Sequence, residues 1–172
     1  PIGNWDTSNV TTMGWMFQNA IIFNQNINTK IITAGVSPTG SEYTAWNTIN
    51  VIKMNSMFYE ASSFNQPIGN WDTSKVTTMG WMFQNAIIFN QNINTKKITA
   101  GVSPTGSEYT AWNTSNVIKM TNMFNEASSF DQPIGNWNTS KVTDMSWMFR
   151  KASSFNHSID TKKILEDVSL NI

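Results

Sequence analysis

Residues 67–91, PIGNWDTSKVTTMGWMFQNAIIFNQ, contain one complete copy of the pattern that organises this chain. Counted from Trp71 as zero, apolar residues fall at offsets +5, +8, +11, +12, +15, +18 and +22. The same offsets recur from four more tryptophans, and we call all five the landmark tryptophans: Trp5, Trp46, Trp71, Trp112 and Trp137. A pattern repeated five times specifies an architecture strongly and a chemistry hardly at all.

The landmark tryptophans are 41, 25, 41 and 25 residues apart, so alternate copies of a 25-residue unit carry 16 additional residues. Two units form a super-repeat of 66 residues, and residues 1–46 match residues 67–112 except at Asn9/Lys75 and Ile31/Lys97. We therefore predict one repeat domain over residues 1–172, cut from a longer array. Its coils are expected to start near residues 1, 42, 67, 108 and 133, with a C-terminal cap near 157–172.

Each unit combines two apolar periodicities. Trp71 and Thr73 alternate with polar residues, which predicts a strand near 68–74 with these two side chains inward. The following apolar residues are spaced as on one face of a helix, which predicts a short helix near 76–86. A repeat of 20–29 residues is typical of leucine-rich repeats. The predicted fold class is therefore an α/β repeat solenoid, a leucine-rich-repeat-like curved array of short parallel strands and short helices.

The additional residues, near 28–44 and 94–110, consist of β-prone runs on either side of GVSPTG, which predicts a β-hairpin insertion in alternate coils. Units with a complete insertion also carry a tryptophan at offset +10 and an isoleucine pair at +16 and +17. The short units have serine or asparagine at these offsets. We expect the hairpins to cover this apolar patch, which includes Trp15, Trp81, Ile87 and Ile88; Trp147 also occupies offset +10.

Composition argues against several classes of function. Eleven basic residues balance eleven acidic ones, so no basic face for nucleic acid is expected. The chain has no cysteine and a single histidine, His157, and it contains no cluster with metal-ligand spacing and no nucleophile motif. No stretch is long and apolar enough to span a bilayer. We predict no enzyme activity, no catalytic residue, no metal, no cofactor and no membrane insertion of this segment.

The motif of residues 71–90, WDTSKVTTMGWMFQNAIIFN, closely resembles the BspA-like leucine-rich repeats of bacterial surface proteins, and most of all the subset in mycoplasma-type surface lipoproteins, a domain of unknown function. The resemblance covers almost the whole chain. It implies a cell-surface or secreted repeat protein, with adhesion, host-matrix binding or antigenic variation as its role, and it supplies no catalytic residues. The insertions, and asparagine at Asn47, Asn113 and Asn138, depart from the family pattern.

Polar residues directly after the landmark tryptophans form the first candidate binding surface: Asp6, Asn47, Asp72, Asn113 and Asn138. The alternative is that these side chains bond neighbouring backbone or one another. A second ladder, one residue after the +18 phenylalanine, is expected to be structural: Asn24, Asn65, Asn90, Asp131 and Asn156. The hairpin tips 35–41 and 101–107 are the other candidate contacts, with hydroxyl groups on Ser37, Thr39, Ser103 and Thr105.

Two functions follow from these features. The first is a non-enzymatic cell-surface module that binds an extracellular protein or glycan through the polar ladder and the two identical tips, a geometry that favours avidity. The second is a structural spacer or antigenically variable stalk without a specific ligand. We also expect the N-terminal coil to expose a strand edge, so dimerisation through residues 1–10 is a further hypothesis.

Overall fold

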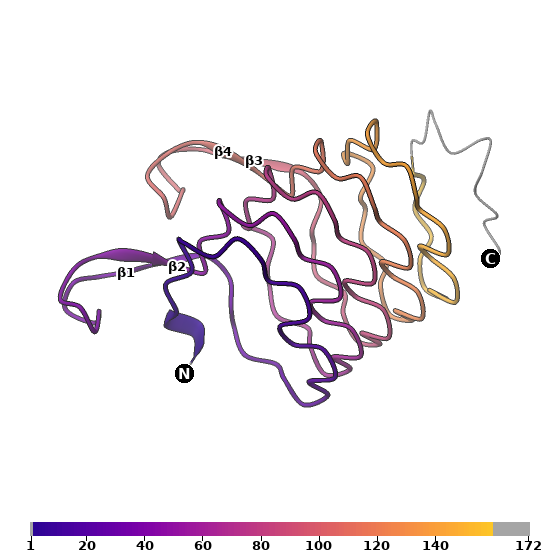
Figure 1. Cartoon of the computed structure of the whole chain (residues 1–172), viewed down its shortest axis with the longest axis horizontal. Helices are drawn as coiled ribbons and strands as arrows, with labels where there is room; N and C mark the ends of the chain where they lie inside the picture. Colours follow the sequence, from indigo (N-terminus) through magenta and orange to yellow (C-terminus); the bar gives the residue numbers. More distant parts are fainter. Residues whose placement is uncertain (1, 160–172) are drawn as a thin grey trace.

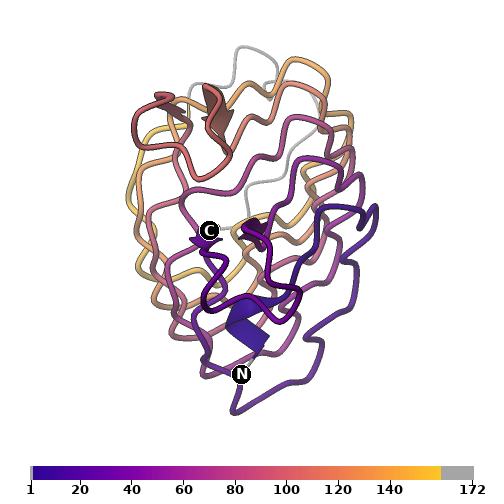
Figure 2. The same ribbon diagram turned by 90° about the vertical axis from the view of Figure 1, so that its left-hand side faces the viewer.

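The structure, a computed structural model, describes residues 2–159. The repeats form five stacked layers, each beginning at a landmark tryptophan (Figure 1). Viewed along the stack, the layers nearly superimpose (Figure 2). Isolated parallel bridges join the residue at offset +7 of each layer to its counterpart in the next, in the series Thr12, Lys53, Thr78, Lys119 and Asp144.

Regular secondary structure is sparse and almost entirely β. A 3-10 helix, η1 (Ile2–Asn4), opens the described chain. Strand β1 (Lys30–Ile32) pairs antiparallel with β2 (Tyr43–Ala45), and β3 (Lys96–Ile98) pairs antiparallel with β4 (Tyr109–Ala111). These two hairpins confirm the predicted insertions.

The predicted α/β array of parallel strands and short helices is wrong. Within residues 2–159 no α-helix occurs, and the only multi-residue strands are those of the two antiparallel hairpins. The segment 68–74, predicted to be a strand, instead forms turns, in which Trp71 N–H donates to the Ile68 carbonyl and Val76 N–H donates to the Thr73 carbonyl. The predicted cap near 157–172 lies almost wholly outside the described residues.

The segment predicted to be a helix, residues 76–86, shows why the periodicity was misleading. A helix needs every N–H to reach the carbonyl four residues back. Here alternate N–H groups leave the layer: Trp81 N–H donates to the Thr121 carbonyl at 2.8 Å, and Phe83 N–H donates to the Met123 carbonyl at 2.9 Å. The intervening N–H groups bond three residues back, as in turns. Successive turns thus reproduce an apolar spacing that resembles a helix face.

The core confirms the apolar offsets. In the second and third layers all residues at these offsets are fully buried, and their rings stack on the equivalent rings above and below. Phe58, for example, lies 4.0 Å from Phe64 in its own layer and 5.5 Å from Phe83 in the next, measured between ring centroids. Thr73 is also buried, as predicted. Burial of a continuous aromatic column is the main favourable contribution to this stack.

The hairpins do not cover the apolar patch at offsets +10, +16 and +17. Tyr43 and Tyr109 donate their hydroxyl hydrogens to the carbonyls of Asn4 and Asn70, which anchors each hairpin to the segment before a landmark tryptophan. Figure 1 shows both hairpins projecting along the stack toward its N-terminal end. The expectation that they fold over Trp81 is therefore wrong, because their anchoring tyrosines attach them elsewhere on the layers.

Candidate functional site

The polar ladder after the landmark tryptophans is occupied by local hydrogen bonds. In each of its five residues, Oδ1 accepts the backbone N–H two residues later, at 2.9 to 3.2 Å. Such Asx turns fix the local backbone. The ladder is stacked, since Thr7, Thr48, Thr73 and Thr114 donate their hydroxyl hydrogens to its carbonyls in the next layer. These contacts favour the structural alternative for Asp6, Asn47, Asp72, Asn113 and Asn138.

The hairpin tips differ in their surroundings although their sequences are the same. In both tips the two predicted hydroxyl groups bond each other: Ser37 to Thr39 at 2.9 Å, and Ser103 to Thr105 at 2.8 Å. The second tip docks on the first hairpin, because Thr44 Oγ1 donates to the Pro104 carbonyl at 2.8 Å. Ser103 is consequently buried. Only the second tip therefore contacts the other hairpin, and within residues 2–159 no hydrogen bond joins either tip to the polar ladder.

The residues at offset +10 form a different feature, which we call the tryptophan row: Trp15, Trp81 and Trp147, with Ser56 and Asn122 between them. Backbone bonds place consecutive members in adjacent layers, such as Ser56 N–H to the Gly80 carbonyl. The three indoles are 57%, 39% and 53% exposed. Ile21, Ile22, Ile87 and Ile88 lie in the same layers and are also exposed.

Every member of the tryptophan row has a left-handed backbone. The φ angles of Trp15, Trp81 and Trp147 are 60°, 58° and 60°, and those of Ser56 and Asn122 are 55° and 54°. Asparagine tolerates this conformation, whereas a bulky side chain is strained by roughly 1–3 kcal/mol. Each of these tryptophans is only partly buried and lies outside the hydrophobic core cluster, so core packing alone does not explain why tryptophan occupies these positions. The same left-handed backbone occurs at offset +14 of every layer and at the fully buried Trp46 and Trp112, so it belongs to the turns of the repeat.

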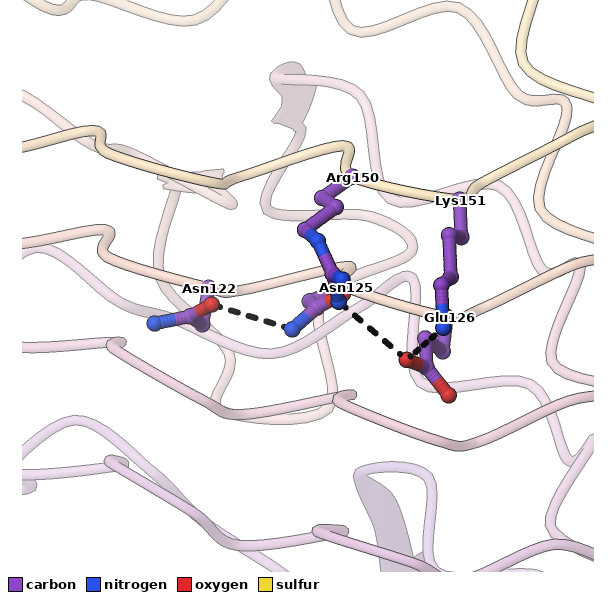
Figure 3. Close-up of polar contacts among 5 residues, drawn as sticks. All are labelled: Asn122, Asn125, Glu126, Arg150 and Lys151. Carbon is purple, nitrogen blue, oxygen red and sulfur yellow. Dashed lines mark hydrogen bonds and ion pairs between the residues drawn. The ribbon is translucent and has the colours of Figure 1, made fainter. Parts of the chain in front are cut away.

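A polar cluster lies beside the C-terminal part of the tryptophan row (Figure 3). Asn125 donates to Asn122 Oδ1 at 3.0 Å, and Glu126 pairs with Arg150 at 3.3 Å and with Lys151 at 2.8 Å. The Arg150 guanidinium lies 4.9 Å from the Trp147 ring centroid, in a cation–π contact. The hydrogen bond from Lys151 lowers the pKa of Glu126.

Two buried amide oxygens near the row have no hydrogen-bond partner among the described residues, Gln84 Oε1 and Asn125 Oδ1. Asn125 is 6% exposed, so this acceptor is withdrawn from solvent. In the second layer, Tyr59 and Glu60 occupy the positions equivalent to Asn125 and Glu126. Burial, and then a hydrogen bond with Glu60, raise the pKa of Tyr59. Glu60 forms no ion pair within residues 2–159.

No group of three or more acidic, histidine or cysteine side chains that could hold a metal ion occurs among the described residues. The single histidine, His157, contacts Asp131, with Nε2 lying 3.2 Å from Oδ1, in the second polar ladder. That ladder is structural as predicted, but it acts between layers: each Oδ1 accepts the N–H of its counterpart in the next layer, as Asn65 does from Asn90.

Comparison with known proteins places the chain in a family. A family model described as Mycoplasma protein of unknown function, DUF285, matches residues 1–37, 30–102 and 105–169. The chain belongs to DUF285. This confirms the resemblance to the mycoplasma-type repeats, while the wider relation to BspA-like leucine-rich repeats stays a prediction. Neither the search of curated proteins nor that of solved structures gave a match. The part of this DUF285 chain that the structure describes contains no helix long and apolar enough to cross a membrane.

The tryptophan row has a signal in the sequence. Offset +10 alternates between tryptophan and a small polar residue, whereas the core offsets keep their residue type in every copy. That alternation is the signal. From the sequence alone this signal predicts docking of the hairpins, because tryptophan and insertion occur in the same units.

Proposed function

We propose that this DUF285 chain is a non-enzymatic binding module that engages an extracellular protein or glycan through the tryptophan row. The observation that carries the proposal is the exposure of three tryptophans at the same offset of alternate layers, outside the hydrophobic core cluster. Exposed aromatic side chains are the residue type most enriched at binding hot spots. The resemblance to BspA-like surface repeats supports a location on the cell surface or outside the cell.

The polar ladder and the hairpin tips are weaker candidates for the contact surface. The ladder side chains are used in Asx turns, and the tip hydroxyls bond one another. The valines Val36 and Val102 are exposed in both tips, but only the second tip contacts the other hairpin, where Ser103 is buried. A ligand that bound through the tips would therefore meet two unlike surfaces, which removes the avidity expected from identical copies.

The competing function is a spacer whose repeats set length without a specific ligand. Its support is the continuous ladder of interlayer bonds together with the near identity of residues 1–46 and 67–112, which allows layers to be added in register. The spacer function leaves the exposed tryptophans unexplained. Dimerisation through residues 1–10 stays a prediction.

Capture on a panel of extracellular-matrix proteins and glycans tests the proposal. The test variant replaces Trp15, Trp81 and Trp147 by serine, the residue found at Ser56. The matched control exchanges tip residues 35–41 and 101–107 for inert loops. Saturable capture that is lost in the serine variant and kept in the loop control is the expected result. Capture by neither wild type nor control, from protein with intact thermal unfolding, would support the spacer.

A further inference from the structure

We propose that the ligand of the tryptophan row is an uncharged, extended polysaccharide of β-linked sugars in which alternate sugars present the same face. This inference rests on the proposed function, because it names the chemistry of the ligand at the same site. It joins three observations: the spacing of the indoles, the polar groups between them and the charge of the surface.

The spacing of the indoles follows from the layers. Adjacent hydrogen-bonded backbones are separated by about 4.8 Å, and equivalent aromatic rings of adjacent layers lie 5.5 to 6.5 Å apart between centroids, so tryptophans in alternate layers are separated by roughly 10–13 Å. In an extended β-1,4-linked chain each sugar is turned by half a revolution relative to its neighbour, and a disaccharide has a similar length. Every second sugar can therefore place its apolar C–H face on an indole, as aromatic side chains allow.

The groups between the indoles suit the sugars that do not stack. Ser56 and Asn122 lie in the intervening layers, and the acceptors Gln84 Oε1 and Asn125 Oδ1 are close by without partners. A sugar carries several hydroxyl groups, each of which donates one hydrogen bond. Small shifts of these amide side chains would bring their oxygens to such donors, and a buried acceptor gains most from being satisfied.

The charges beside the row favour an uncharged ligand. The charges of Glu60, Glu126, Arg150 and Lys151 sum to zero: Glu126 pairs with both Arg150 and Lys151, and Glu60 forms no ion pair within residues 2–159. A sulfated or carboxylated glycan would bring further negative charge to Glu60. A membrane surface or a second copy of the chain would prefer a continuous apolar face, whereas here polar residues interrupt the apolar ones in alternate layers.

The test uses affinity electrophoresis and calorimetry of the whole chain with β-1,4-linked oligosaccharides of glucose or N-acetylglucosamine long enough to span the three indoles. The α-1,4-linked glucose oligomer and heparin serve as ligand controls. We expect binding of a β-linked oligomer that weakens about tenfold or more in Trp81→Ser, since truncating a central aromatic contact removes a hot spot. Ile88→Ser, which removes an exposed apolar side chain of the same layer, should bind as wild type.

Three results would overturn the inference: no binding of any uncharged β-linked glycan by folded protein, equal binding of the α-linked oligomer, or equal loss in Trp81→Ser and Ile88→Ser. The proposed function is judged separately. Capture of a matrix protein that depends on the tryptophan row would keep the binding module and reject the polysaccharide. If no ligand is captured in a way that depends on the tryptophan row, both the binding module and the polysaccharide ligand are rejected.

Discussion

Two sets of tryptophans in this DUF285 chain have the same residue type and opposite environments. Trp46, Trp71 and Trp112 are fully buried, and each indole N–H donates to a carbonyl of another repeat, as Trp71 does to Ile27 at 3.2 Å. The tryptophan row is exposed, and its indoles alternate with serine or asparagine. Invariance therefore indicates packing inside the stack, although Trp5 in the first layer is 48% exposed, whereas alternation between layers indicates a position outside the core.

The largest effect is expected in the buried column. Trp71→Ala should lower the free energy of unfolding by about 3–5 kcal/mol, because it opens a cavity between two stacked layers. Denaturant unfolding followed by circular dichroism measures the loss. A loss below that of Trp81→Ala would contradict the division of the tryptophans into core and surface.

A second variant separates packing from hydrogen bonding in the same column. Trp71→Phe keeps an aromatic ring but leaves the buried Ile27 carbonyl without its indole donor, so it should cost about 1–3 kcal/mol. The measurement is again denaturant unfolding, with Phe83→Leu as a control for altered aromatic packing alone. Wild-type stability in Trp71→Phe would show that the indole bond contributes nothing.

Replacing a tryptophan of the exposed row should raise the stability of the protein, in contrast to the buried column. Trp81→Asn places a residue that tolerates φ near 58° at a strained position and removes no core contact, so stability should rise by about 1 kcal/mol. The reverse exchange, Asn122→Trp, is the matched control and should be destabilising. Ligand capture should fall in Trp81→Asn although the protein is more stable. A less stable Trp81→Asn would show that the indole is part of the core after all.

The smallest effect concerns the charges beside Trp147. The pKa of Glu126 is lowered in the folded chain, so its contribution to stability is complete above its ordinary pKa of 4.5 and is lost as the pH falls through the lowered value. Wild type should thus exceed Glu126→Gln slightly near pH 7, and the two should converge in acid. The difference is expected to be small because the pair is partly exposed and screened by salt. Thermal unfolding of both proteins across this pH range measures it.

The elements differ in how far the sequence determined them. The hairpins were predictable because GVSPTG separates two β-prone runs, and the core was predictable because its offsets recur five times. The prediction of a helix was wrong because the spacing of Met79, Met82, Phe83 and Ala86 fits both a helix and a series of turns. Only the partner of each N–H distinguishes the two, and for the N–H groups that leave the layer this partner lies 24 or 40 residues away.

The candidate site shows the same limit. The Asx alternative for Asp72 and its equivalents was available from residue type alone. Exposure of Trp15, Trp81 and Trp147 was not, because it depends on the direction in which each hairpin leaves its layer. Tyr43 and Tyr109 anchor the hairpins through hydrogen bonds to carbonyls 39 residues away. Such bonds cannot be predicted from the local sequence.

The interlayer hydrogen bonds also give the stack a polarity. In each of the first four layers the N–H groups at offsets +8, +10, +12 and +14 donate to the following layer, whereas the N–H at +6 of each later layer donates to the preceding one. Aligned peptide dipoles add, as they do in a helix. The stack therefore carries a permanent dipole moment along its axis, and its positive end points toward increasing residue number. An applied electric field would orient it, and the moment would grow with each added layer.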